Sequence, residues 1–367
     1  MSKPRRRKQK KQVKAELKLR QFAATELSDQ LAALPCAADL PRFMVDTVAG
    51  AYAPADAKLM IEGFGAAATR PVTLRANTLK ATAEDIAAAL DAACIAHQTV
   101  TWYPDAFILP EAQVSDLWDL DIYRDGKIYL QSLSSMMPPL VLGAQAGEDI
   151  LDMCAAPGGK TTQIAALTQG QAHLTACEMS IPRAEKLESN LHRQGAKNVP
   201  VMRIDARELD EFFRFDRILL DAPCTGTGTV ISGNEKSLRG LTEQLLSKCA
   251  RSQRALLERA MGALKPGGTL VYSTCSILPQ ENEDALQEAL DKHMDCELIP
   301  LDGTPSESEA RRTQEAGEEP RIESNALTEA IAAGQVSAIV NGLPGTLTIP
   351  PSRDFEGFYI ALIRKRS

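Results

Sequence analysis

The sequence lacks any apolar run long enough to cross a membrane, and no short apolar stretch follows its charged N-terminus as in a secretory signal. Its eight cysteines include no C-x-x-C pair, and no Cys/His cluster has the spacing of zinc ligands. These absences argue against a membrane protein, a secreted disulfide scaffold and a zinc protein. We therefore expect a cytoplasmic protein without a metal site, whose cysteines are thiols.

Charge is distributed unevenly along the 367 residues, whose formal net charge is −7. The first 20 residues hold ten Lys/Arg and one Glu, so this segment carries +9 and the remainder carries −16. Residues 281–330 hold fifteen Asp/Glu against four Lys/Arg, and we expect this acidic segment to face away from any RNA. We expect residues 1–20 to be a disordered basic arm that contacts phosphates, although a solvated tail that binds nothing explains the charge equally well.

The length and the hydrophobic pattern predict two folded units. Helical patterns lie near 15–34, 43–51 and 53–65, and strand patterns lie at 70–80, 98–103 and 126–130, with Thr82 as a helix cap. We therefore predict that residues 21–125 form a small α+β module. In residues 126–367, apolar strands alternate with helices from Asp149 onward, which is typical of a doubly wound, mostly parallel α/β sheet. The polar, acidic residues 303–325 are predicted to form a loop or insertion.

The segment DILDMCAAPGGKTT (Asp149–Thr162) predicts a strand, a turn of small residues and a helix. Ligands of doubly wound sheets bind at such turns, where the helix start offers free N–H groups. A phosphate-binding P-loop is excluded because Cys154 stands where the motif requires glycine, and G-x-G-x-x-G is absent. The class of ligand that fits this turn is therefore a nucleoside-like molecule without a polyphosphate. Glu178 and Asp205, at the ends of the next two predicted strands, are candidates to bind its ribose and its adenine, although ordinary strand-end acids are the alternative.

Two cysteines follow two further predicted strands. Cys224 lies in LLDAPCTGTG, three residues after Asp221, and Cys275 lies in VYSTCSILPQENE. A cysteine near a helix start or a cation has its thiolate favoured, whereas most buried cysteines are inert packing residues. Two cysteines at the carboxyl ends of neighbouring strands, beside a ligand-binding turn, favour a catalytic function.

The three motifs AAPGGKT, DAPCTGTG and YSTCS, in this order, resemble the signature of the RNA 5-methylcytosine methyltransferases, which include the bacterial 16S rRNA enzymes and the Nop2/Sun proteins. The segments RANTLK, GKIYLQSLSSMMPPLVL and DFEGFYIALIRK extend the resemblance over about residues 70–365. The resemblance implies a Rossmann-like, S-adenosylmethionine-dependent methyltransferase domain that follows an RNA-binding module. It also implies an RNA partner, with rRNA expected first and tRNA second, and we expect a monomer.

The resemblance also implies roles for residues in a reaction that passes through a covalent cysteine–C6 adduct. Cys275 would be the nucleophile and Cys224 would serve product release, while Asp221 and Lys160 would bind and polarise the cytosine. The cofactor would lie across Cys154, Ala155, Ala156, Pro157, Gly158 and Gly159, with Lys160, Glu178, Arg183, Asp205 and Asp221 as further contacts.

Three alternatives stay open at this point. A non-catalytic RNA-binding scaffold would be favoured by loss of either motif cysteine, and both are present. A methyltransferase with another substrate is disfavoured by the cysteine pair, because most methyl transfers need no thiol. A P-loop NTPase is the least favoured of the three, given Cys154.

Overall fold

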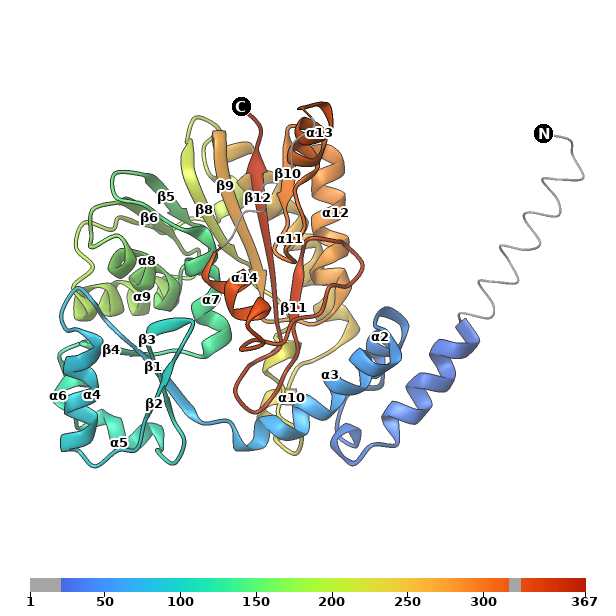
Figure 1. Ribbon diagram of the computed structural model, residues 1–367, viewed down its shortest axis with the longest axis horizontal. Helices are drawn as coiled ribbons and strands as arrows, with labels where there is room; N and C mark the ends of the chain where they lie inside the picture. The colour runs from blue at the N-terminus through green and yellow to red at the C-terminus, as the bar shows by residue number, and fades with distance from the viewer. Residues whose placement is uncertain (1–20, 317–324) are drawn as a thin grey trace, which may run out of the picture.

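The computed structural model describes residues 21–316 and 325–367 (Figure 1). The predicted basic arm, residues 1–20, lies outside the described residues. Residues 21–32 are helical, which confirms the described part of the first predicted helix. The next two predicted helices are also confirmed. These first elements are η1 (Pro35–Ala37), α2 (Arg42–Ala51), α3 (Pro54–Ala66) and η2 (Ala67–Thr69).

A four-stranded antiparallel sheet follows, in the order β2-β3-β1-β4. The predicted cap at Thr82 is confirmed, because its Oγ1 accepts a hydrogen bond from Asp85 N and the Asp85 carboxylate accepts one from Thr82 N. Strand β3 was not predicted. The elements of this unit are β1 (Val72–Ala76), α4 (Ala83–Ala92), β2 (Gln98–Val100), β3 (Tyr103–Leu109), α5 (Val114–Trp118), α6 (Asp121–Arg124) and β4 (Ile128–Leu130).

The second sheet has eight strands, with the order β10-β12-β9-β8-β5-β6-β7 and β11 paired to β12. The pairs from β9 to β7 are parallel, whereas β12 runs antiparallel to β9, β10 and β11. This confirms the predicted mostly parallel α/β sheet. The strands are β5 (Asp149–Asp152), β6 (His173–Cys177), β7 (Val201–Met202), β8 (Phe215–Asp221), β9 (Leu264–Thr274), β10 (Cys296–Ile299), β11 (Leu347–Ile349) and β12 (Phe358–Lys365).

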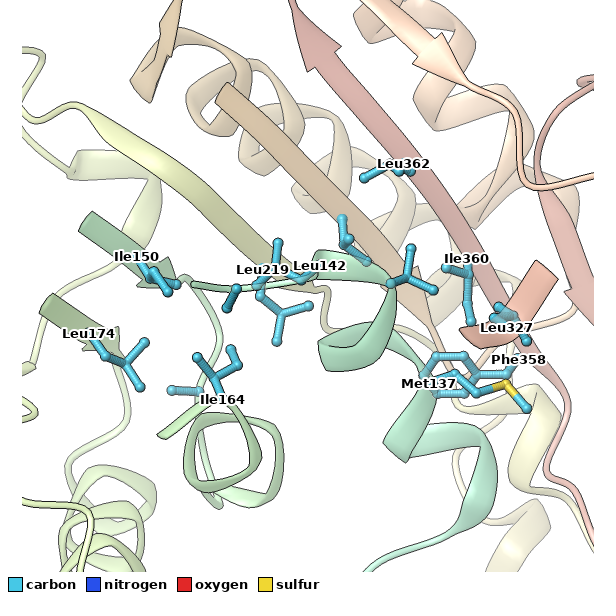
Figure 2. Packing of buried hydrophobic residues seen from close by; sticks show 14 of the residues in the cluster. Met137, Leu142, Ile150, Ile164, Leu174, Leu219, Leu327, Phe358, Ile360 and Leu362 are labelled. Carbon is cyan, nitrogen blue, oxygen red and sulfur yellow. The ribbon is translucent and has the colours of Figure 1, made fainter. Parts of the chain in front are cut away.

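Helices cover both faces of this sheet, because neighbouring strand residues point in opposite directions. Ile150 packs in the cluster with α7, α8, α9 and α14, part of which Figure 2 shows, whereas Leu151 packs in the cluster with α11 and α12. The helices are α7 (Leu133–Leu142), α8 (Gly159–Leu167), α9 (Ile181–Gln194), α10 (Glu235–Leu238), α11 (Glu243–Ala263), α12 (Glu283–Lys292), α13 (Glu307–Ala316) and α14 (Ala326–Ala332), with η3 (Ala206–Glu208), η4 (Thr227–Thr229) and η5 (Pro279–Glu281) between them.

The prediction of a loop over residues 303–325 is wrong in part, because α13 occupies Glu307–Ala316 and residues 317–324 lie outside the described residues. This segment is polar, but its Glu, Ala and Arg residues are good helix formers, and the Ser306 hydroxyl accepts a hydrogen bond from Glu309 N at the helix start. The acidic stretch is not uniformly exposed either, since Glu281 and Glu283 are buried.

Helices α2 and α3 pack against the large domain. Their buried side chains share one apolar cluster with Val230, Leu246 and Ile277, and the Tyr52 hydroxyl donates a hydrogen bond to the Ile277 carbonyl (2.7 Å). The predicted limits of the two folding units, at residues 125 and 126, stay a prediction. Within the part of the chain that the structure describes, no helix has the length and apolar character needed to span a bilayer.

Candidate active site

The turn between β5 and α8 is fixed by contacts from α9. Gly158 has a φ of 107°, and a Cβ atom there would lie 2.9 Å from Leu187 Cδ1, so only glycine is accommodated without strain. Asn190 Nδ2 donates to the Pro157 carbonyl (2.7 Å), and Arg183 Nη2 donates to the Ala156 carbonyl (2.9 Å). The turn therefore has a defined shape before any ligand binds.

Asp152, the last residue of β5, lies beneath this turn and was not singled out from the sequence. It is 1% exposed, and its Oδ2 accepts a hydrogen bond from Thr161 Oγ1 (2.7 Å), while Oδ1 is buried and has no partner among the described residues. Burial raises the pKa of Asp152 to about 6. A buried carboxylate oxygen without a partner is a favourable place for a cationic ligand group.

We expect Asp152→Asn to flatten the dependence of stability on pH. The folded-state pKa lies above the ordinary value, so folding takes up a proton, and the contribution of Asp152 to the free energy of unfolding falls by about 3 kcal/mol as pH rises from about 4 to above 6. Urea unfolding of the ligand-free protein between pH 4.5 and 8 measures this. The exposed Asp39→Asn is the control, and an unchanged slope in Asp152→Asn would contradict the assignment.

The two predicted carboxylates line a small hollow on the other side of the turn, together with Cys154 and Arg183. Glu178 is 4% exposed, pairs with Arg183 (3.0 Å) and accepts a hydrogen bond from Ser180 N. Asp205 lies beyond the end of β7, which is only two residues long, and Arg207 hydrogen bonds lower the pKa of its carboxyl. The hollow thus presents two carboxylates that arginines orient.

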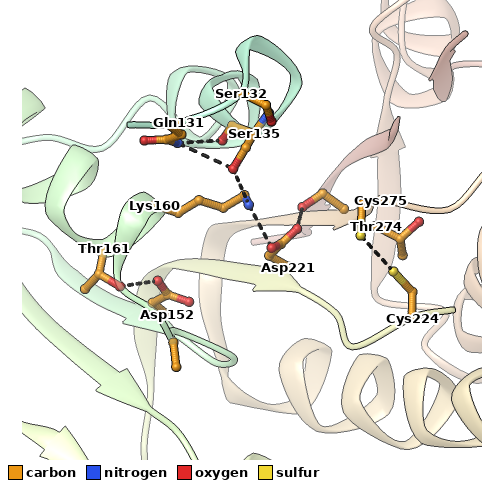
Figure 3. A network of polar contacts seen from close by, with 12 residues as sticks. Gln131, Ser132, Ser135, Asp152, Lys160, Thr161, Asp221, Cys224, Thr274 and Cys275 are labelled. Atoms are coloured by element: carbon orange, nitrogen blue, oxygen red, sulfur yellow. Dashed lines mark hydrogen bonds and ion pairs between the residues drawn. The ribbon is translucent and has the colours of Figure 1, made fainter. Parts of the chain in front are cut away.

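A cavity of about 470 Å³ lies in front of the carboxyl ends of β5, β8 and β9. Inside it, Lys160 Nζ contacts Asp221 Oδ2 (2.8 Å) and Ser135 Oγ (2.8 Å), as Figure 3 shows. Ser273 Oγ donates to the other Asp221 oxygen (2.8 Å). Burial disfavours the ammonium of Lys160, but the Asp221 carboxylate outweighs it and raises the pKa of Lys160. The cavity therefore contains a fixed ion pair at neutral pH.

The two motif cysteines are in contact, although 51 residues separate them in the chain. Cys224 Sγ and Cys275 Sγ lie 3.3 Å apart, because the parallel strands β8 and β9 end side by side (Figure 3). Its contact with Cys275 and its burial raise the pKa of Cys224 well above the ordinary value. Cys275 lines the cavity and interacts electrostatically with Lys160. Helix α12 begins only at Glu283, so its start does not directly follow Cys275.

The loop that carries Cys224 is anchored by hydrogen bonds to the Glu281 carboxylate, and Glu281 was not predicted from the sequence. Its carboxylate is fully buried and accepts hydrogen bonds from Thr225 N (2.7 Å) and Gln253 Nε2 (3.3 Å). Gly228 N donates to the Cys275 carbonyl (2.9 Å), which ties the two cysteine loops together. Buried carboxylates that accept several hydrogen bonds stiffen the segments they join. This support fixes the positions of both sulfur atoms.

The structure thus brings the predicted residues to two neighbouring hollows that share Cys154. The cavity collects Lys160, Asp221, Cys275 and most of the turn, and the small hollow collects Glu178, Arg183 and Asp205. Cys224 touches Cys275 but does not line either hollow. The cavity residues that sequence reasoning missed are Tyr129, Leu130, Gln131, Ser132, Ser135, Asp152, Thr229, Glu356 and Phe358. Ser132, Ser135 and Glu356 lie inside segments that carry the family resemblance, and that position is the only signal for them in the sequence.

The sheet order, the helices on both faces and the ligand turn after β5 define the Rossmann-like methyltransferase fold, and the four-stranded unit before it is ferredoxin-like. The family model described as 16S rRNA methyltransferase RsmB/F matches residues 139–364, and the RsmF/B-like ferredoxin-like domain matches residues 40–115. The chain belongs to the RsmB/F methyltransferase family, and the resemblance stated from the motifs is confirmed.

Three similar proteins illustrate the relationship. Ribosomal RNA small subunit methyltransferase F of Aeromonas salmonicida is 40% identical over 249 residues, which are 65% of this chain and 52% of that protein. The protein of the same name from Vibrio parahaemolyticus is 34% identical over 318 residues, 84% of this chain and 60% of that protein. The crystal structure of a methyltransferase homolog protein from Pyrococcus horikoshii has a TM-score of 0.69 and 31% identity, covering 93% of this chain and 99% of that one. The chain thus spans only 52–60% of the two curated relatives.

Proposed function

We propose that this protein is an S-adenosylmethionine-dependent methyltransferase that forms 5-methylcytosine in RNA, with ribosomal RNA as the substrate. The observation that carries the proposal is the pair of sulfur atoms 3.3 Å apart beside the Lys160–Asp221 ion pair, at the carboxyl ends of strands that also carry the ligand turn. Most methyl transfers need no thiol, whereas cytosine C5 requires a nucleophile to activate it.

The residues around the turn fit S-adenosylmethionine. Glu178 and Asp205 are acceptors suited to ribose hydroxyls and to the adenine amino group. The Asp152 oxygen that has no partner within residues 21–316 and 325–367 suits the cationic amino-acid end. The glycine turn admits close backbone approach. When bound, this cofactor supplies an electrophilic sulfonium methyl group. Absence of polyphosphate-binding geometry, with Cys154 in place of the P-loop glycine, supports this cofactor over a nucleotide.

Cys275 acts as the nucleophile in this proposal. Its thiolate sulfur forms a bond to cytosine C6, and the C5–C6 π electrons make C5 electron-rich enough to accept the methyl group. The Lys160 ammonium lines the same cavity as the Cys275 sulfur. Two of the three Lys160 N–H groups are engaged by Asp221 and Ser135, which leaves one to stabilise charge that develops on the base near N3.

Cys224 serves the release of the product. After methyl transfer, a base removes the C5 proton, and the S–C6 bond breaks so that Cys275 leaves as a thiolate. Because its pKa is raised, Cys224 holds its proton, and at 3.3 Å it can donate an S–H hydrogen bond to the departing sulfur. This stabilises the leaving group at the step that frees the RNA.

The cavity must receive the base out of any stack, so the substrate cytosine is flipped or unpaired. The ferredoxin-like unit and the basic arm supply contacts to the RNA backbone in this proposal, with tRNA as the second substrate candidate. The protein acts in the cytoplasm as a monomer, and the names of the curated relatives support the choice of small-subunit rRNA.

We expect Glu178→Gln to raise the dissociation constant for S-adenosylmethionine by roughly 10-fold or more, because it removes the charge from a buried acceptor. Isothermal titration calorimetry measures this in the absence of RNA. Glu188→Gln, on the exposed part of the same helix–strand unit, is the matched control. Equal affinity in Glu178→Gln and wild type would remove Glu178 from the cofactor site.

The function itself is tested by incubating the protein with S-adenosylmethionine and, separately, deproteinised 16S rRNA, assembled 30S subunits and total tRNA. We expect 5-methylcytosine at one or a few positions of the rRNA, mapped by bisulfite sequencing. Product on tRNA alone would transfer the proposal to the second substrate. Binding of S-adenosylmethionine without methylcytosine on any of these RNAs would contradict the reaction proposed.

A further inference from the structure

Glu356 places a third carboxylate in the cavity, beside Asp152 and Asp221, on the segment that precedes β12. Its Oε2 accepts a hydrogen bond from Ser132 Oγ (2.6 Å), the cap of α7. Its Oε1 accepts no hydrogen bond from the residues that the structure describes. Asp221 differs, because both of its oxygens are engaged, by Lys160 and by Ser273. Among the described residues, Asp152 beneath the cofactor turn and Glu356 are therefore the cavity carboxylates with an oxygen left for a ligand, and Glu356 is the one on the segment before β12.

The position of Glu356 is fixed by groups from three parts of the chain. Ser134 Oγ donates to the Glu356 carbonyl (2.8 Å), and Arg70 Nη2 donates to the Phe355 carbonyl (2.9 Å). Gly357 N donates to the Gly228 carbonyl (2.8 Å), which belongs to the loop after Cys224. A Cβ at Gly228 would lie 1.8 Å from the Gly357 carbonyl oxygen, so the two segments are packed at the limit of backbone approach. Such support is typical of a side chain that must meet a ligand in one orientation.

We propose that Glu356 reads the exocyclic amino group of the target base and thereby selects cytosine over uracil. This inference rests on the proposed function and adds to it the residue that sets base specificity. A carboxylate only accepts hydrogen bonds, so it pairs with the N4 amino group of cytosine. Uracil carries a carbonyl oxygen at that position, which would face Glu356 as one acceptor against another.

A separate group must select cytosine over uracil, because addition of the thiolate does not distinguish the two bases. Addition of Cys275 to C6 activates C5 of uracil in the same way as C5 of cytosine, and the two rings have nearly the same shape. Lys160 can donate to an acceptor on either base. The two bases differ in hydrogen bonding at positions 3 and 4, so discrimination must come from groups that recognise these positions, and Glu356 has the chemistry that matches the amino group at position 4.

The test uses short RNAs that carry 5-fluorocytidine or 5-fluorouridine at the mapped target position. Fluorine at C5 cannot leave as a proton does, so the S–C6 bond persists and the adduct is counted on a denaturing gel. Glu356→Gln keeps the size of the side chain, removes its charge and adds an N–H donor that suits uracil O4. Asp354→Asn, two residues away and outside the cavity lining, is the matched control.

We expect wild type and Asp354→Asn to trap 5-fluorocytidine much faster than 5-fluorouridine. Glu356→Gln should lower this ratio of rates by roughly 5- to 150-fold, the discrimination expected of one good base-edge contact. An unchanged ratio, or an equal loss with both bases, would overturn the assignment, as would a rise confined to the KM for S-adenosylmethionine. If wild type forms no methylcytosine on any RNA, the proposed function itself is wrong. If wild type forms methylcytosine but Glu356→Gln leaves the ratio of rates unchanged, only the role of Glu356 is wrong.

Discussion

Cys275→Ala is expected to abolish formation of 5-methylcytosine, with a fall in rate of roughly 10⁴-fold or more. Without the sulfur, no bond to C6 forms, and C5 is too electron-poor to accept a methyl group. The affinity for S-adenosylmethionine should stay within about threefold of wild type, because Cys275 belongs to the cavity and not to the hollow that holds Glu178 and Asp205. Single-turnover methylation and calorimetry separate the two effects.

The matched control is Cys249→Ala, which removes a thiol from helix α11 without touching either hollow. It should methylate at nearly the wild-type rate. If Cys275→Ala methylated as fast as this control, the covalent mechanism would be wrong. The contact between the two cysteines would then need an explanation other than covalent catalysis.

The second large effect is expected for Cys224→Ala, and it differs in kind from the first. The nucleophile, the ion pair and the cofactor turn all remain, so the S–C6 bond forms and the methyl group is transferred. The departing Cys275 sulfur then lacks the thiol that lies 3.3 Å away in the wild type. We expect a protein–RNA complex that survives denaturing electrophoresis and carries the methyl label, while multiple turnover stops.

Two further variants sharpen this result. Cys224→Ala combined with Cys275→Ala should form no adduct, which identifies the attacking sulfur. Cys224→Ser keeps an O–H donor at the same place and should release product faster than Cys224→Ala. Rapid turnover of Cys224→Ala, with no accumulated complex, would show that Cys224 has no part in release.

Local signals in the sequence were sufficient for much of the framework. Thr82 and the helix formers behind it predicted the capped helix α4, and the alternation of strands and helices after Asp149 predicted the large sheet. These features depend on neighbours within a few residues or on simple periodicity. The small-residue turn before α8 was also predicted locally, and Gly158 there has the positive φ that favours glycine. Helix α13 was missed because Ala310 and Ala316 are its only apolar residues, so the sequence shows no apolar helical stripe there.

Contacts between segments far apart in the chain could not be predicted from the sequence. Arg75 reads in the sequence as a polar residue of a strand, yet it is fully buried and donates to the Gly159 carbonyl (3.0 Å) and to Thr162 Oγ1 (2.7 Å). This strand of the ferredoxin-like unit thereby supports the first turn of α8. A buried cation requires several hydrogen-bond acceptors, and no local sequence pattern predicts them when they lie far away in the chain.

By itself the sequence determined the alternation of strands and helices after Asp149, the ligand turn and the two strand ends that carry Cys224 and Cys275, because each of these depends on residues close together in the chain. Only the tertiary structure decided that the two sulfur atoms touch, that one buried Asp152 oxygen has no partner among the described residues, and that Glu356 enters the same cavity as Lys160. Parallel strands β8 and β9 end at one edge of the sheet, and antiparallel β12 begins at that same edge. The pairing of strands thus brings residues more than 130 positions apart to one site, and pairing partners are not encoded locally.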